Sequence, residues 1–181
     1  MGAKFGGTTR EVELVQLLAS PVHRYEGRPV DGPRPVEGSE LRDAIELRAG
    51  LGVIGDRHFA HPAHRQASVT LQSVEALEHV AAELGVPVPG LTETRRNVLL
   101  RGIDVDALVG VTFALDSGAG PVRFRAHRPA NPCAWMNEAI APGAHRALLR
   151  RGGIRAEPLT DGALALGRAV LTVEPAEVSR R

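Results

Sequence analysis

Short segments of strand character, each ended by turn-forming residues, recur along the chain and restrict its fold more than any other feature does. Apolar residues that alternate or run together between turns are typical of β-strands, and the chain has 20 glycines and 13 prolines to form the turns. Many short strands with few helices favour a barrel of mostly antiparallel strands over a doubly wound sheet. We expect strands in 11–21, from 44 onwards, in 67–71 and in 95–100, a hairpin in 111–127 that turns at 116–120, and a closing hairpin in 162–174 that turns at Gly167 and Arg168.

A helix is expected in 74–84, where apolar residues recur at helical spacing. Ser73 is a suitable N-cap for it, and Gly85 supplies a stop. The predicted class is mainly β with a few helices, an α+β fold. The length of 181 residues and the hydrophobic content of 43% indicate a single domain, 1–181. Shorter helical pieces are expected in 104–110, 134–140 and 143–151.

Overall charge and the chain's first residues exclude several partner classes. The formal net charge of +1 does not indicate a nucleic-acid-binding protein. The sequence MGAKFGGTTR contains no apolar core of a signal peptide, and no later stretch is apolar for long enough to span a bilayer. We therefore expect a cytoplasmic protein with no membrane or nucleic-acid partner. The single cysteine cannot form an intramolecular disulfide, so its thiol is available for chemistry.

Arginine carries almost all of the positive charge, because Lys4 is the only lysine among 22 basic residues. A Schiff-base mechanism needs a buried lysine, and a nucleotide-binding P-loop needs the lysine of GxxxxGK[ST]. The sequence offers neither. Pyridoxal-phosphate catalysis and P-loop nucleotide hydrolysis are therefore disfavoured.

Cys133 is the candidate reactive residue. Pro132 precedes it and a helical piece follows it, which places the sulfur near a helix N-terminus. The preceding strand alternates apolar with cationic residues, and cations near a thiol favour the reactive thiolate. A buried structural cysteine is the alternative. The cations expected on the approach to Cys133 are Arg123, Arg125, His127 and Arg128.

A glycine-rich segment ends in three histidines, His58, His61 and His64, at three-residue spacing. Three histidines can bind a metal ion, but Pro62 disfavours one continuous helix that presents all three. We favour the alternative that they are loop residues and that Asp56 and its neighbours fix the loop.

Arg95, Arg96 and Asn97 open a predicted strand, where alternation places Arg95 and Asn97 on one face and Arg96 on the other. A guanidinium beside a carboxamide suits a phosphate or the edge of a pterin. Turn stabilisation is the alternative role for Asn97, and simple surface exposure is the alternative for Arg96.

Five segments, in order, resemble the MOSC domain, a family named for the C-terminal domain of molybdenum cofactor sulfurases. The resemblance covers about 51–173 and implies a mostly antiparallel β-barrel. It also implies a pocket for the molybdenum cofactor (molybdopterin) and a cysteine that carries sulfur as a persulfide or ligates molybdenum. The segments are GLGVIGDRH, RQASVTL, RRNVLLRGIDVDALVGVTFAL, NPCAWM and RGGIRAEPLTDGALALGRAV.

By this resemblance Cys133 is the catalytic sulfur carrier or the molybdenum ligand, and Arg95 with Asn97 holds the phosphate and pterin of the cofactor. The implied activities are reduction of N-hydroxylated compounds or transfer of sulfur, and whether the cofactor stays permanently bound is open. The remaining cofactor-binding candidates are Asn131, Pro132, Arg128, Asp56 and His58.

The sequence also departs from the larger members of this family. They carry an additional N-terminal β-rich part that completes the cofactor site. A sulfur-carrier role would need a separate pyridoxal-phosphate-dependent desulfurase, because this chain has no suitable lysine, and a reductase role would need a redox partner. The alternative from another class is a non-catalytic binding protein, in which arginines hold an anionic small molecule and Cys133 is structural.

Overall fold

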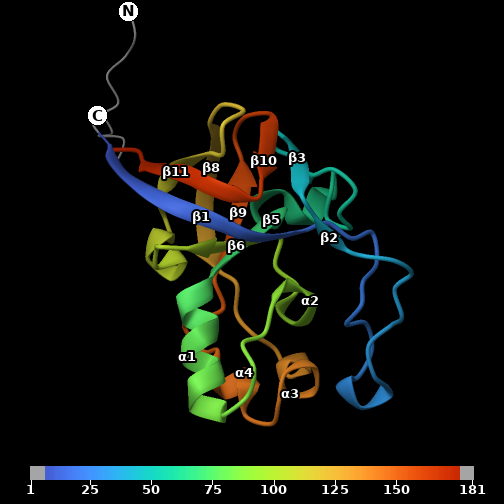
Figure 1. The fold of residues 1–181 in the computed structure, drawn as a ribbon. Helices are drawn as coiled ribbons and strands as arrows, with labels where there is room; N and C mark the ends of the chain where they lie inside the picture. Colours follow the sequence, from blue (N-terminus) through green and yellow to red (C-terminus); the bar gives the residue numbers. More distant parts are fainter. Residues whose placement is uncertain (1–6, 176–181) are drawn as a thin grey trace, which may run out of the picture.

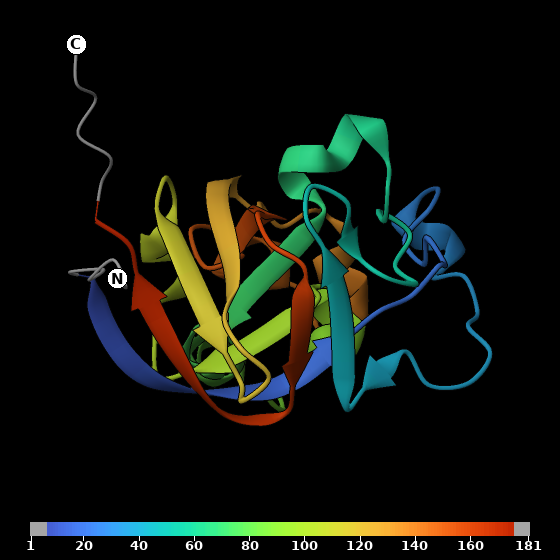
Figure 2. The same cartoon turned by 90° about the horizontal axis from the view of Figure 1, so that it is seen from above.

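Seven β-strands form a closed barrel in the computed structural model, which describes residues 7–175 and so leaves Lys4 outside the described part (Figure 1). The barrel strands are β1 (Thr8–Leu18), β5 (Val69–Ser73), β6 (Val98–Arg101), β7 (Thr112–Asp116), β8 (Val122–Pro129), β9 (Ile154–Pro158) and β11 (Gly167–Val173). They follow one another in the order β11-β7-β8-β9-β5-β6-β1. Pairing of β1 with β11 closes the ring, and Figure 2 shows these strands in blue and red at the closure.

All pairings between the described strands are antiparallel except that of β5 with β6. Those two run parallel because helix α1 (Val74–Leu84) connects them as a crossover. The predicted fold class, a mainly β, mostly antiparallel barrel with few helices, is therefore confirmed. Outside the ring, β2 (Leu41–Arg42) pairs with the end of β1, and β3 (Ala44–Arg48), β4 (Gly52–Val53) and β10 (Gly162–Ala165) form a smaller sheet.

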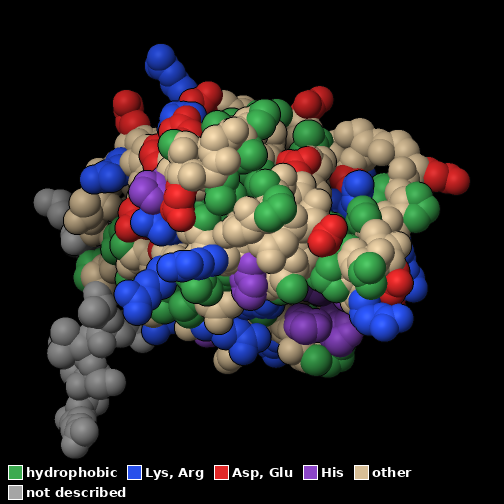
Figure 3. Space-filling view, turned by 90° about the horizontal axis from the view of Figure 1, so that it is seen from below, with side chains coloured by type: hydrophobic (Ala, Val, Ile, Leu, Met, Phe, Trp, Pro, Cys, Tyr) green, Lys and Arg blue, Asp and Glu red, His purple; other side chains and the backbone are tan. Residues whose placement is uncertain are grey.

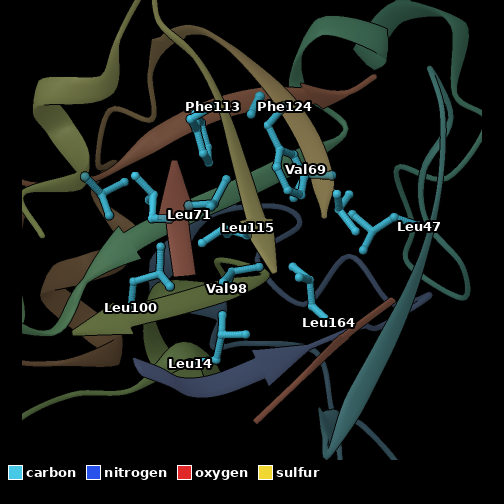
Figure 4. Close-up of a cluster of buried hydrophobic side chains, with 14 of the residues drawn as sticks. Leu14, Leu47, Val69, Leu71, Val98, Leu100, Phe113, Leu115, Phe124 and Leu164 are labelled. Carbon is cyan, nitrogen blue, oxygen red and sulfur yellow. The ribbon is translucent and has the colours of Figure 1, made fainter. Parts of the chain in front are cut away.

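Alternation along the strands fills the barrel with apolar side chains. In β8, Val122, Phe124 and Ala126 are buried, whereas the residues between them are partly or fully exposed. Phe124 stacks on Phe113 with ring centroids 5.4 Å apart, and both lie with Leu71 among the side chains drawn in Figure 4. The hairpin predicted in 111–127 is confirmed by the pairing of β7 with β8.

The helices gather beside the barrel and enclose a second apolar cluster that includes Leu77, Trp135 and Leu148 (Figure 1). Ser73 occupies the N-cap of α1 as predicted, but its hydroxyl makes no cap bond and instead donates to the Ile103 carbonyl. The predicted stop at Gly85 is confirmed by its left-handed backbone. The other helices are α2 (Leu91–Thr94), α3 (Trp135–Ala139), α4 (Ala144–Ala147) and the 3-10 helices Pro29–Asp31, Pro62–Ala67 and Val105–Leu108. Within residues 7–175, none combines the length and apolar character needed to cross a membrane.

Two sequence-based predictions of strands are wrong. The closing hairpin does not form, because β10 pairs with β3 whereas β11 pairs with β7 and β1. The chain passes from the small sheet into the barrel at Gly167, so the turn signal was correct but the pairing was not. The strand predicted to open at Arg95 begins only at Val98. The sequence analysis also missed β9, whose apolar residues are interrupted by charged ones.

Candidate functional site

Cys133 is exposed and lies in the short loop between β8 and α3, two residues before the helix begins. Burial lowers the pKa of Arg96 and of Arg155, whereas the nearby thiol, when ionised, acts in the opposite direction on each guanidinium. The side chain of Trp135 is buried, and its ring stacks on Tyr25 with centroids 5.0 Å apart. The loop therefore presents a thiol to solvent beside arginine side chains, and the tryptophan anchors it.

Arg96 holds the loop that carries Cys133. Its Nη2 donates to the Ala130 carbonyl at 2.7 Å, and its Nε donates to the Gly152 carbonyl at 2.9 Å. A third bond joins Nη1 to the Thr94 carbonyl at 3.3 Å. Burial, with help from the positive charge of Arg155, lowers the pKa of Arg96 to about 10. Simple surface exposure, the alternative considered for Arg96, therefore does not apply, and this residue instead fixes the position of the cysteine loop.

Gly152 permits this loop to approach the barrel closely. A Cβ atom at this position would lie 2.2 Å from the Ala130 carbonyl oxygen and 3.3 Å from the Pro132 ring. Only a glycine fits there. The backbone of Ala130 also donates to the Gly153 carbonyl at 2.7 Å.

Arg95 does not share a strand face with Asn97. Its backbone is left-handed, with φ of 60°, because it caps α2. Its guanidinium forms two bonds of 2.6 Å to the buried carboxylate of Glu40, which Arg24 also approaches at 3.5 Å. The strand alternation used in the sequence analysis therefore does not apply to Arg95, whose charge Glu40 already neutralises.

Asn97 is buried, and both ends of its amide have partners. Its Oδ1 accepts from the backbone and the hydroxyl of Thr70, at 2.9 and 3.0 Å. Its Nδ2 donates to the Leu18 carbonyl at 3.2 Å and to Asp56 Oδ2 at 3.0 Å. Asp56 in turn accepts from the backbone of Ser20 and His58, while burial raises its pKa. Asn97 and Asp56 thus fix the glycine-rich loop against the barrel end.

Arginines surround a small hollow of about 60 Å³ beside this loop, which we call the arginine hollow. Burial and the charge of Arg128 lower the pKa of Arg155, and burial also lowers the pKa of Arg57 despite neighbouring Asp56. Among the described residues, no hydrogen bond or ion pair engages the guanidinium groups of Arg57, Arg128 and Arg155. The lining includes Asp56, His58, Asn97 and the arginines Arg57, Arg95, Arg96 and Arg155.

The other residues predicted to surround Cys133 differ in their exposure and in their partners. Arg128 is exposed, and its Cα is the cross-strand neighbour of that of Arg155, while Asn131 is exposed and Pro132 half-buried. The cationic face of β8 is largely occupied by other partners: Arg123 forms a bidentate pair with Glu174, Arg125 bonds Thr112, and His127 pairs with Glu157.

Sequence reasoning did not propose Arg57, Arg96 or Arg155 as binding residues, although they line the arginine hollow. It gave Arg155 low functional weight and gave Arg57 a part in fixing the loop. The one usable signal was that arginine replaces lysine almost everywhere, which suits planar, forked contacts rather than simple solvation.

Two of the three histidines of the glycine-rich loop, His58 and His64, stack on each other, and the ring of His61 is tilted against that of His64. The rings of His58 and His64 lie 4.6 Å apart, and those of His61 and His64 lie 4.7 Å apart. Within the described residues, no three histidine, cysteine or acidic side chains are arranged to hold a metal ion. The positive charges nearby and burial lower the pKa of His58 to about 3, with burial the larger cause.

We expect acid to destabilise the protein through His58. Between pH 6.5 and about 3 the unfolded chain binds a proton at this ring and the folded protein does not, so lowering the pH favours unfolding. His58→Gln should therefore lose less unfolding free energy between pH 7 and pH 4 than wild type does, as measured by urea denaturation. Equal losses in the two proteins would contradict the lowered pKa.

Arg96→Met should loosen the cysteine loop. We expect the unfolding free energy to fall by about 1–3 kcal/mol, because carbonyl oxygens are left without partners. Amide hydrogen exchange at Ala130 should become faster. Arg101→Met is the matched control, because that arginine forms an exposed pair with Glu78 and its loss should change the unfolding free energy little. Unchanged exchange at Ala130 in Arg96→Met would show that Arg96 does not hold the loop.

Neither the scan of protein-family models nor the search of curated proteins finds a significant match to this chain. Solved structures nevertheless share its fold. The YuaD protein of Bacillus subtilis superposes with a TM-score of 0.71 at 18% identity, over 93% of this chain and 99% of that one.

Two other solved structures are YiiM proteins. YiiM of Escherichia coli gives a TM-score of 0.55 at 15% identity, over 91% of this chain and 71% of that one. YiiM of Geobacillus stearothermophilus gives 0.57 at 16% identity, over 93% and 77%. At these identities the similarity concerns the fold alone, and it is consistent with a MOSC-like fold.

Proposed function

We propose that this chain binds the molybdenum cofactor and uses Cys133 either as the molybdenum ligand or as the carrier of a persulfide sulfur. One observation carries the proposal: an exposed thiol lies within electrostatic reach of buried Arg96 and of Arg155, and Arg155 forms no ion pair among the described residues. The MOSC-like fold and the motifs around Cys133 support the same conclusion.

The side chains present suit such a cofactor. A thiolate is a soft ligand of the kind that soft metals and sulfur prefer. Within residues 7–175, the guanidinium groups of Arg57, Arg128 and Arg155 form no ion pair, and such groups match an anionic phosphate. Arg95 and Asn97 are less suitable than their sequence suggested, because Glu40 and Thr70 already engage them. We therefore assign the phosphate to Arg128, whose Cα is the cross-strand neighbour of that of Arg155.

Each residue has a distinct proposed role. When bound, the cofactor supplies two-electron redox chemistry. Cys133 Sγ holds its metal, and Arg96 keeps the loop of Cys133 in position through the Ala130 carbonyl. His58 is uncharged at neutral pH, so its ring offers one hydrogen-bond donor and one acceptor at the hollow.

The two versions of the proposal differ in their chemistry. As a reductase, the protein converts an N-hydroxylated compound to the amine and water, consuming two protons and two electrons from a separate redox partner. As a carrier, the Cys133 thiolate attacks the terminal sulfur of a persulfide on a separate desulfurase. A sulfur–sulfur bond then forms on Cys133, and the cysteine of the desulfurase leaves as a thiolate.

Two assays on the anaerobically purified protein separate these versions. Turnover of a hydroxylamine-type substrate with a chemical reductant supports the reductase, whereas a mass gain of one sulfur atom at Cys133 after incubation with a cysteine desulfurase and cysteine supports the carrier. Cys133→Ser is the control for both assays. A wild-type protein that gives neither result would contradict both versions.

A non-catalytic anion-binding protein is the second candidate. It is favoured by one observation, namely that Cys133 is not among the residues that line the arginine hollow. Under this alternative Cys133→Ser leaves anion binding unchanged, and fluorescence of Trp135, the only tryptophan, reports the binding in both proteins.

A further inference from the structure

A larger hollow opens beside the arginine hollow and has a different lining. Its volume is about 390 Å³, within the range of small-molecule sites. Figure 3 shows histidine side chains gathered beside arginines on this face of the molecule. We call it the histidine hollow, and it is lined by His23, Arg57, His58, His61, His64 and Arg155.

The lining offers flat, uncharged rings together with positive charge. Burial is the main cause that lowers the pKa of His23, His58 and His64, so these rings are predominantly neutral at pH 7. The stacked pair of His58 and His64 makes a planar surface, on which another ring can stack.

The charged part of the lining is entirely cationic. Arg57 and Arg155 form no ion pair within the described residues, and no carboxylate lines the histidine hollow. Asp56, the nearest acidic residue along the chain, already accepts hydrogen bonds from Ser20, His58 and Asn97. The hollow therefore repels a metal cation and attracts an anion.

We propose that the histidine hollow is a binding site for the substrate, and that it takes a flat ring bearing a carboxylate or phosphate group. The ring stacks on the histidines, and Arg155 and Arg57 donate to the anionic group in charge-assisted hydrogen bonds. The claim that this ligand is the substrate for the chemistry of Cys133 rests on the proposed function. Binding of the ligand itself requires no cofactor. Both hollows share Arg57, His58 and Arg155, which joins the site to the arginines near Cys133.

The test uses the full-length Cys133→Ser protein, which has no thiol, and follows its histidine ring protons by NMR. Benzoate, phenyl phosphate and the neutral benzamide are titrated separately. We expect the anions to bind at least about tenfold more tightly than benzamide, the ratio given by about 1.4 kcal/mol of charge-assisted hydrogen bonding. Comparison of the affinities for benzoate and phenyl phosphate shows which anionic group the site prefers. Signals of His58, His61 and His64 should shift, while those of His79 and His145, which lie outside the hollow, should not.

Substitutions in the lining of the histidine hollow identify the residues that bind the anionic group. Arg155→Gln should remove most of the preference for the anions and leave benzamide binding unchanged, whereas Arg125→Gln removes the same charge outside the hollow and should change neither. His64→Gln should weaken binding of all three ligands, because it removes one face of the ring stack. Equal binding of benzoate and benzamide, or shifts at all histidines alike, would overturn the inference.

A final titration separates the substrate from the cofactor. Wild-type protein that carries the molybdenum cofactor should still bind benzoate with shifts at His61 and His64. Displacement of benzoate by the cofactor would overturn the assignment to substrate, because the cofactor would then occupy the hollow. A wild-type protein without molybdenum, pterin or persulfide would instead defeat the proposed function, while the benzoate titration would still decide on anion binding.

Discussion

Replacement of Cys133 by serine is expected to abolish retention of molybdenum and formation of a persulfide while leaving the fold intact. The thiol is exposed and makes no hydrogen bond among the described residues, so its loss should change the unfolding free energy by less than about 0.5 kcal/mol. Pterin should be bound more weakly rather than lost, because Arg128, which we assign to its phosphate, remains. Molybdenum and pterin are measured separately on the same preparation, together with a urea denaturation curve.

Ala134→Ser is the matched control, since it adds the same hydroxyl at the next exposed position of the loop. It should retain wild-type levels of molybdenum or persulfide. If Cys133→Ser kept molybdenum in wild-type amounts, and accepted sulfur as well, the thiol would have no role in either version of the proposal.

Replacement of Gly153 by alanine is expected to give the largest loss of stability. Its φ of 83° is strained for any residue with a Cβ, and that atom would lie 2.0 Å from the Leu71 carbonyl oxygen. Gly153 also accepts from the backbone of Ala130, and the next residue, Ile154, pairs with Leu71 of β5. The strain therefore falls where the start of β9 contacts both the cysteine loop and β5. We expect the unfolding free energy to drop by more than about 3 kcal/mol, as measured by urea denaturation.

Gly167→Ala separates the two causes. Gly167 has a φ of 109°, but nothing lies within 4 Å of the position of a Cβ atom there. Its replacement should therefore cost only the backbone strain, about 1–2 kcal/mol. Equal losses for the two variants would mean that close approach to the Leu71 carbonyl contributes nothing.

The fold was largely predictable because most strands carry local signals. The alternation of Val122, Phe124 and Ala126, and the turn before them, specify β8 and its hairpin without reference to the rest of the chain. The pairing of β10 with β3 depends on residues more than a hundred positions apart, and nothing local distinguishes it from pairing with the adjacent β11. Such long-range pairing is decided by packing, which single-sequence patterns do not report.

The candidate site was less predictable than the fold. The exposure of Cys133 agrees with a functional thiol, and the sequence motif indicated the residue directly. The partners of Arg95 and Arg96 could not be predicted. Arg95 is a left-handed helix cap, so the alternation of side chains along a strand does not apply to it. Glu40 and the Ala130 carbonyl, which engage these arginines, lie far away in sequence. Their spacing along the chain therefore carries no signal for either contact.

The most direct test of the central claim is elemental analysis combined with pterin fluorescence on wild-type protein purified anaerobically from molybdate-fed cells. We predict molybdenum and pterin in equal amounts, close to one of each per chain, for the version in which Cys133 ligates the metal. If Cys133 is a transient carrier, we predict a persulfide at this residue in the same preparation. Absence of molybdenum, pterin and persulfide from the wild-type protein would contradict the account and leave an anion-binding protein in its place.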